Sequence, residues 1–211
     1  IEKGGDGLWR IHGVGIGGLA QPKSTLEMGN SGTSTRLLMG LVGGHNISAT
    51  FTGDASLSTR PMKRVMTPLE MMGVKFESAE GGRLPLTLHG PQDALSIEDK
   101  LPVASAQVKS AIILAGLNAR GITTVIEATP TRDHTENMLR HFGLEVKTEK
   151  LPDGSMAISV AGQQEMQPCA VDVPGDPSSA AFPVVAALLQ QGSDIRIERV
   201  CVGERRNGIY L

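Results

Sequence analysis

The sequence has few aromatic residues, few cysteines, almost no net charge and no long hydrophobic run. Its 211 residues include one Trp, one Tyr and four Phe, and the formal net charge is −2. A nucleic-acid surface needs a basic stripe and usually stacking rings, so this class of function is disfavoured. The longest apolar run, Ala180–Leu189, contains a proline and falls well short of the roughly 18 residues that cross a membrane. We expect neither a nucleic-acid partner nor a membrane partner.

The two cysteines, Cys169 and Cys201, are too few for a disulfide framework and do not form a CxxC metal pair. We therefore predict free thiols in a reducing, cytoplasmic compartment. The sequence shows no signal peptide. It begins with Ile1 rather than Met, and we expect further residues to precede it. The hydrophobic fraction of 40% is typical of a folded protein.

One order of elements recurs along the chain. Three helix-like segments begin with Ser, Thr or Gly and end at a glycine, at Thr33–Gly44, Ser105–Gly121 and Ser178–Gly192. Each is followed by a strand-like run and by a turn that carries an arginine, namely Arg60, Arg132 and Arg205. A second helix and an alternating strand complete the first two copies. The predicted unit is β-α-β-α-β-β, with copies at approximately 1–90, 91–162 and 163–211.

The polarity of these segments predicts how they are layered. The first helix of each copy is apolar nearly all round, which is typical of a buried helix. The strands alternate instead: Leu84, Leu86 and Leu88 are separated by Pro85 and Thr87. Alternation indicates a sheet with one face in solvent. We predict an α/β fold with helices inside and sheets outside, the reverse of a dinucleotide-binding fold.

Two glycine- and hydroxyl-rich segments are candidates for anion binding. The run GNSGTSTR, Gly29–Arg36, opens a predicted buried helix, whose free N–H groups and dipole attract anions. The run GDASLSTRPMKR places Arg60 before Pro61 at an expected helix start, where an arginine suits a carboxylate or phosphate. A plain N-cap for the first run and a solvated turn arginine for the second remain open alternatives. Lys63 and Arg64 are expected on a helix surface.

Later helix starts carry similar groups. Ser105, the N–H groups of Ala106 and Gln107, and the Gln107 amide form a neutral cradle for anions and hydroxyls. Asp176 is expected to cap the third helix. In TRDHTEN, beginning at Thr131, Asp133 is expected as an N-cap with Glu136 completing a capping box.

Two other motifs carry less weight. His134 and His141 lack further ligand residues nearby, so a metal site is not expected. The run GVGIGG, with Gly13, Gly15 and Gly18, matches a dinucleotide fingerprint, but no apolar helix follows it and a surface loop is expected. Because equivalent helix starts should lie on one side of a repeat, the predicted ligands are small, multiply charged anions such as phosphorylated carboxylates.

Five motifs in this order, GNSGTSTR, GDASLSTRPM, LPVASAQVKSAIILAGL, TRDHTENML and VPGDPSSAAFPVVAAL, resemble the 5-enolpyruvylshikimate-3-phosphate (EPSP) synthase family, especially its bacterial class II. The resemblance covers essentially the whole chain. It implies an inside-out α/β barrel of βαβαββ repeats with buried helices, forming one of two domains. It also implies an enolpyruvyl (carboxyvinyl) transferase of the shikimate pathway to chorismate and the aromatic amino acids. The substrates would be phosphoenolpyruvate and shikimate 3-phosphate, with no cofactor and no metal.

The resemblance assigns roles residue by residue. Ser105, Ala106, Gln107 and Arg132 match positions that hold shikimate 3-phosphate. Arg60 and Gln107 match positions that hold phosphoenolpyruvate. Gly32 matches the position where an alanine obstructs the inhibitor glyphosate, so glycine there implies a sensitive site. Arg36 is expected to be structural.

The chain also departs from the family pattern. The family's opening Lys-Ser motif and its second, C-terminal domain, which supplies the acid/base residues, are absent. We therefore predict an N-terminal-type domain, incomplete at its start, with no catalytic residue of its own and no turnover alone. Two alternatives remain open: an enzyme like UDP-N-acetylglucosamine enolpyruvyl transferase, which needs a reactive cysteine in a mobile loop, and a non-catalytic anion-binding domain.

Overall fold

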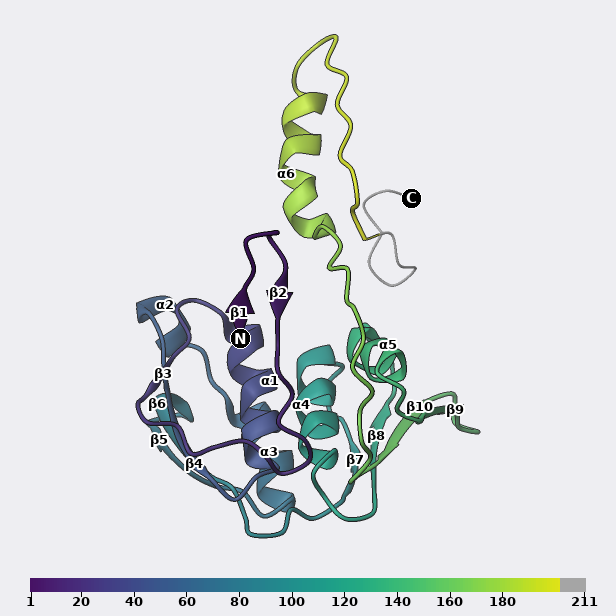
Figure 1. The fold of residues 1–211 in the computed structure, drawn as a ribbon. Coiled ribbons are helices and arrows are strands. Elements are labelled where there is room, and N and C mark those ends of the chain that lie inside the picture. The colour runs from purple at the N-terminus through teal and green to yellow at the C-terminus, as the bar shows by residue number, and fades with distance from the viewer. Residues whose placement is uncertain (202–211) are drawn as a thin grey trace.

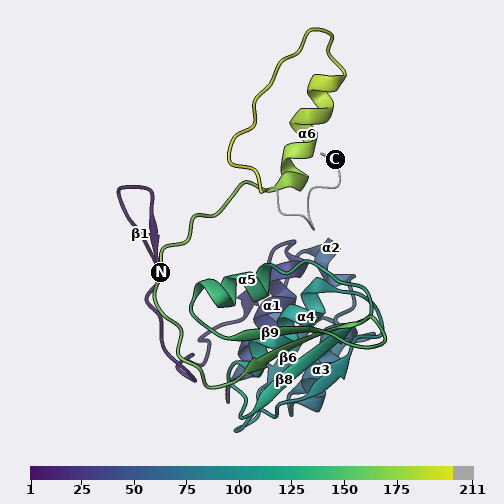
Figure 2. The same cartoon turned by 90° about the vertical axis from the view of Figure 1, so that its right-hand side faces the viewer.

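The computed structural model describes residues 1–201, so the predicted Arg205 turn lies outside the described residues. Two sheets flank a pair of central helices, and a hairpin and one further helix project from this body (Figures 1 and 2). The hairpin consists of β1 (Glu2–Lys3) and β2 (Trp9–Arg10). Within the described residues, no helix has the length and apolar character needed to span a bilayer.

The first sheet has the strand order β3-β4-β6-β5. Its strands are β3 (Leu26–Glu27), β4 (Ser48–Thr52), β5 (Lys75–Ala79) and β6 (Arg83–His89). The helices of this half are α1 (Gly32–Gly43), α2 (Ala55–Ser58) and α3 (Lys63–Met71). β3 and β4 are parallel, whereas β6 is antiparallel to β4 and β5.

The second sheet has the equivalent order β7-β8-β10-β9. Its strands are β7 (Glu98–Lys100), β8 (Ile122–Glu127), β9 (Val146–Lys150) and β10 (Met156–Ala161), and its helices are α4 (Ala106–Gly116) and α5 (His134–His141). β7 and β8 are parallel, and β10 is antiparallel to β8 and β9. The two halves thus share strand order and direction, which confirms the βαβαββ repeat for these two copies.

The central helices α1 and α4 come into close contact because small residues face each other. A Cβ built on Gly40 would lie 2.2 Å from the Ala111 carbonyl oxygen, and one on Gly44 would lie 2.7 Å from the Ala115 carbonyl oxygen. Only glycine permits this separation of the backbones. The predicted layering is confirmed here, since Met39 and Ile112 on these helices are completely buried.

The sheet polarity is also confirmed on β6. Leu84, Leu86 and Leu88 are 0–3% exposed and face the core, while Pro85 between them is exposed. The Leu84–Pro85 peptide is cis. The sheets therefore form the outside of the body, as the alternation predicted.

The third copy differs from the prediction. Its helix, α6 (Pro177–Leu188), was expected to be buried, yet Phe182 and Leu188 are 79% and 81% exposed. The segment after it, expected as a strand, forms only an isolated bridge between Gly175 and Val200. Residues 163–201 of the third copy contribute no strand to any sheet, so α6 has no sheet of its own to cover and stands apart from the body (Figures 1 and 2). A uniformly apolar sequence predicts burial only where a partner surface exists.

Several helix boundaries also differ from those that the sequence predicts. Helix α4 ends at Gly116, before the predicted Gly121, which instead adopts a left-handed φ of 106° beyond the helix. The short helix α2 was not predicted. Arg60 therefore follows α2 and precedes α3, rather than starting a long helix at Pro61. The glycine-rich run 13–18 is exposed and not followed by a helix, as expected for a surface loop.

Candidate functional site

The starts of α1 and α4 lie side by side at one end of the body, each capped by a serine. Ser31 Oγ accepts a hydrogen bond from the Ser34 amide at 3.2 Å, and Ser105 Oγ accepts one from the Val108 amide at 3.4 Å. Each cap satisfies one of the free N–H groups of a helix start and leaves others available. The positive ends of two helix dipoles therefore meet here (Figure 1).

Gln107 joins these two helix starts. Its Nε2 donates a hydrogen bond to Thr33 Oγ1 at 2.7 Å, and its Oε1 accepts one from Arg36 Nη1. The contact spans 71 positions between Arg36 and Gln107. Arg36 is thus a bridge between α1 and α4, in agreement with the structural role expected for it.

Arg60 reaches the start of α1 from the turn after α2. Its Nη2 donates to Asn30 Oδ1 at 3.1 Å and to Ser56 Oγ at 3.2 Å. Asn30 in turn donates to Asp54 Oδ2 at 2.7 Å, and Asp54 caps α2 by accepting from the Leu57 amide at 2.7 Å. The unpredicted helix α2 is therefore the element that positions Arg60.

Gly32 lies between the two guanidinium groups. A Cβ built there would be 3.4 Å from Arg60 Nη1 and 3.7 Å from Arg36 Nη1. Glycine at this buried position leaves the space between these groups and the start of α1 unobstructed. We call Gly32, Arg36, Arg60 and Gln107 the anion cluster.

The anion cluster carries net positive charge: Asp54 is near enough to Arg60 for their charges to interact, but the cluster itself contains no carboxylate. Partial burial, and then the nearby charges of Arg60 and Arg64, lower the pKa of Arg36. Among residues 1–201, none of these three arginines forms an ion pair with a carboxylate. Arg64 and Lys63 are exposed on α3, as expected. Guanidinium groups that form no direct ion pair and lie near two helix starts suit a phosphate or carboxylate ligand.

The structure does not bring every predicted residue into this cluster. Ser105 and Ala106 open α4 beside the cluster member Gln107, and all three are half-buried. Arg132 is exposed on the loop between β8 and α5, and it makes no hydrogen bond with the α4 start among the described residues. Its loop is nevertheless linked to α4 further along that helix. Thr131 bonds to Glu127, which pairs with Lys109, and Thr135 bonds to Ser110.

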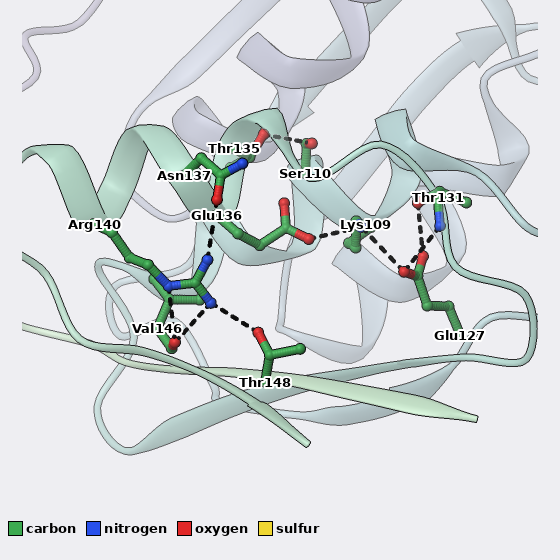
Figure 3. Close-up of polar contacts among 10 residues, drawn as sticks. All are labelled: Lys109, Ser110, Glu127, Thr131, Thr135, Glu136, Asn137, Arg140, Val146 and Thr148. Carbon is green, nitrogen blue, oxygen red and sulfur yellow. Dashed lines mark hydrogen bonds and ion pairs between the residues drawn. The ribbon is translucent and has the colours of Figure 1, made fainter. Parts of the chain in front are cut away.

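A buried triad in that region was missed by the sequence analysis. Lys109 Nζ lies 2.7 Å from Glu136 Oε1 and 3.2 Å from Glu127 Oε1 (Figure 3). The predicted capping box is therefore wrong: Asp133 is the N-cap residue, but its side chain makes no capping hydrogen bond, and Glu136 turns inward to Lys109. The available signal was a lysine within the otherwise apolar segment of α4, because such a charge needs a buried counter-charge.

No group of histidine, cysteine and acidic residues within residues 1–201 is arranged to hold a metal ion. His134 and His141 occupy the two ends of α5, and His141 Nε2 lies 2.9 Å from the Ala170 carbonyl oxygen. Asp176 caps α6 as predicted, accepting from the Ser178 amide at 3.1 Å. Cys169 and Cys201 are free thiols.

Comparison with known proteins adds an independent finding. A family model described as EPSP synthase (3-phosphoshikimate 1-carboxyvinyltransferase) matches residues 3–211. Curated proteins named 3-phosphoshikimate 1-carboxyvinyltransferase from Parvibaculum lavamentivorans and Novosphingobium aromaticivorans are each 60% identical over 210 residues. Each of these matches covers 100% of this chain, but 47% and 48% of the respective relative. The chain thus spans about half the length of the curated relatives it matches.

A solved structure is also similar. The EPSP synthase from Acinetobacter baumannii superimposes with a TM-score of 0.78 at 48% sequence identity, covering 91% of this chain and 42% of that one. This likeness agrees with the repeat topology and with the central pair of helices described above.

Proposed function

The chain belongs to the EPSP synthase family, and from that premise we propose that it is an N-terminal-type domain, made of the repeat copies 1–90, 91–162 and 163–211. The complete enzyme would transfer the enolpyruvyl group of phosphoenolpyruvate to the 5-hydroxyl of shikimate 3-phosphate. The observation that carries this proposal is the anion cluster, where two arginines that form no ion pair with a carboxylate within residues 1–201 lie at two helix starts. Both substrates are polyanions, and such a site stabilises their charge before the reaction begins.

We assign the substrates as follows. Arg60 and Gln107 hold phosphoenolpyruvate, whose carboxylate and phosphate match a guanidinium fork. The start of α4, with Ser105, Ala106 and Gln107, holds shikimate 3-phosphate, and Arg132 contacts its phosphate. The Gln107 amide, shared by both sites, sets the distance between the two reactants.

Gly32 determines access for the inhibitor glyphosate in this proposal. The open space between Arg36 and Arg60 accommodates a small anionic inhibitor beside the start of α1. A Cβ at Gly32 would also lie 3.5 Å from Leu57 Cδ1, so a methyl group there would occupy part of that space. We expect a glyphosate-sensitive enzyme.

The reaction balances as follows. The 5-hydroxyl oxygen of shikimate 3-phosphate bonds to C2 of phosphoenolpyruvate, the enol methylene gains a proton, and a tetrahedral adduct forms. The hydroxyl proton goes to a base. Loss of a methyl proton and of inorganic phosphate from the adduct then yields the enolpyruvyl ether. The cluster supplies charge stabilisation and orientation, while the groups that move protons belong to the C-terminal domain. We therefore propose that the 211-residue chain alone has no turnover. We also propose that the complete enzyme works in the cytoplasm.

The site assignments are tested by steady-state phosphate release with the full-length protein. Arg60→Gln is expected to raise KM for phosphoenolpyruvate, and Arg132→Gln to raise KM for shikimate 3-phosphate. The loss of a charge-assisted hydrogen bond corresponds to an increase in KM of roughly tenfold to a hundredfold. Arg83→Gln, an exposed arginine on β6, is the matched control and should leave both constants unchanged. Equal effects of Arg60→Gln and Arg83→Gln would contradict the assignment.

A further inference from the structure

Lys109 is a charged residue in the interior of the body. Its side chain is 0% exposed and lies between Glu127 and Glu136, whose side chains are 1% and 3% exposed (Figure 3). The three residues come from three elements: α4, the end of β8 and α5. One oxygen of Glu136, Oε2, is buried without a hydrogen-bond partner among the described residues. We call these residues the buried triad.

Stability alone is a poor explanation for the buried triad. The loss of hydration of buried charges offsets much of their mutual attraction, and well-packed apolar residues often serve as well or better. The two carboxylates also outnumber the single ammonium, and one carboxylate oxygen stays unpaired. The triad therefore has a purpose other than net stability, and its remaining contacts indicate what that purpose is.

Glu127 extends the triad into the loop that carries Arg132. Its Oε1 accepts a hydrogen bond from the Thr131 amide at 3.0 Å, and its Oε2 accepts one from Thr131 Oγ1 at 2.6 Å. Both oxygens of the carboxylate thus hold one residue, and Arg132 is the next in the chain. Lys109, paired with Oε1, fixes the carboxylate that holds the loop.

The far side of the same loop is also bonded to α4. Ser110 Oγ lies 2.6 Å from Thr135 Oγ1, in the first turn of α5. Thr131 is therefore linked to Lys109 of α4 through Glu127, and Thr135 is bonded directly to Ser110, the next residue of α4. Lys109 lies only two positions after Gln107. Arg132 itself is exposed, so the location of its guanidinium depends on how firmly its backbone is held.

From this juxtaposition we propose that Lys109, Glu127 and Thr131 are positioning residues, which hold the Arg132 loop in register with the shikimate 3-phosphate cradle at the start of α4. This inference rests on the proposed function for the role of Arg132. A loop held in advance costs less ordering when the phosphate binds. Loosening it lowers the fraction of enzyme ready to bind, which raises KM for shikimate 3-phosphate and changes kcat little.

Thr131→Val is the sharpest perturbation, because it removes one hydroxyl hydrogen bond and leaves the charges of the triad intact. A hydrogen bond to a carboxylate is worth a change of about tenfold in binding. We therefore expect KM for shikimate 3-phosphate of the full-length enzyme to rise about tenfold, with kcat and KM for phosphoenolpyruvate changed less than about twofold. Thr124→Val is the matched control: it breaks the hydroxyl pair, 2.9 Å apart, between Thr124 on β8 and Ser159 on β10, away from the Arg132 loop.

A double-mutant cycle separates positioning from general weakening. In an Arg132→Gln background, Thr131→Val should add less than about twofold to KM, because the group being positioned is already gone. A full tenfold effect in that background, or an equal effect of Thr124→Val, would overturn the proposal. A Thr131→Val enzyme with unchanged KM for shikimate 3-phosphate would do the same.

Amide hydrogen exchange tests the anchoring without turnover. Thr131→Val should speed exchange within residues 128–133, whereas Thr124→Val should not. Unchanged exchange in that segment would refute the anchoring. A wild-type enzyme that releases no phosphate from the two substrates would instead refute the proposed function, so the two failures are distinguishable.

Discussion

Gly40→Ala is the substitution for which the structure gives the clearest prediction. An added Cβ would lie 2.2 Å from the Ala111 carbonyl oxygen, 2.5 Å from its Cα and 2.7 Å from its carbonyl carbon. All three are backbone atoms of α4, so no side-chain rotation relieves the overlap. To restore an ordinary separation of about 3.5 Å, α1 and α4 would have to move apart by roughly 1 Å.

The expected magnitude follows from two opposing effects. Alanine gains about 1 kcal/mol over glycine in a helix interior. Overpacking in a closely packed core costs about 1–3 kcal/mol and more where rigid backbone must shift. Since three backbone contacts are violated together, we expect a net loss of about 2 kcal/mol in the free energy of unfolding. For a cooperative unit of this size, that lowers the melting temperature by roughly 4–8 °C, and by about half as much for a unit twice as long.

Gly32→Ala on the same helix is the matched control. Its Cβ would meet only the ends of flexible side chains, at 3.4 Å or more, so stability should change by less than about 0.5 kcal/mol. Thermal unfolding of the full-length variants, followed by circular dichroism, measures both. Gly40→Ala should also disturb the hydrogen bond between Thr33 and Gln107, and thereby raise KM for phosphoenolpyruvate and for shikimate 3-phosphate. A Gly40→Ala protein as stable as Gly32→Ala would refute the close packing of α1 against α4.

Three further substitutions are predicted from burial and charge. Lys109→Met should lower the free energy of unfolding by about 3–5 kcal/mol because it leaves buried carboxylates unpaired. Lys147→Met, at a 69% exposed lysine, should change this free energy by less than about 1 kcal/mol, and urea denaturation measures both variants. Phe51→Ala in the core should lower the free energy of unfolding by about 3–5 kcal/mol, whereas Phe182→Ala on exposed α6 should lower it by less than about 0.5 kcal/mol. Equal losses would contradict the exposure of α6. Hydrogen bonds from the Ser155 side chain and backbone, and then Lys100, lower the pKa of Asp153 to about 2. Because this pKa lies below the unfolded value of about 3.9, the stabilisation is present above pH 4 and lost toward pH 2, so the urea midpoints of wild type and Asp153→Asn should differ at pH 6 and converge near pH 2.

The features that could be predicted from the sequence are those that depend on local pattern. Alternation at Leu84, Leu86 and Leu88 identifies a half-exposed strand, and a side chain that can accept a hydrogen bond, placed before an apolar run, identifies the caps Ser105 and Asp176. The placement of Arg60 shortly before a helix, α3, follows from the same kind of reasoning, whereas anion binding at the start of α1 stays a prediction.

The features that could not be predicted depend on partners distant in the sequence. Arg36 meets Gln107 across 71 positions, and Lys109 meets Glu127 across 18. No local pattern chooses between a capping role and a buried ion pair for Glu136, because the choice depends on where α4 lies. The exposure of α6 has the same origin, since composition gives its apolar character but not the surface beside it.

The release of inorganic phosphate tests the central claim most directly. The full-length protein and the 211-residue chain are each incubated with phosphoenolpyruvate, with shikimate 3-phosphate, and with both. We predict that the full-length protein releases phosphate only when both substrates are present, and that the 211-residue chain releases none. Phosphate release by the full-length protein from phosphoenolpyruvate alone, no release with both substrates, or turnover by the 211-residue chain would contradict this account.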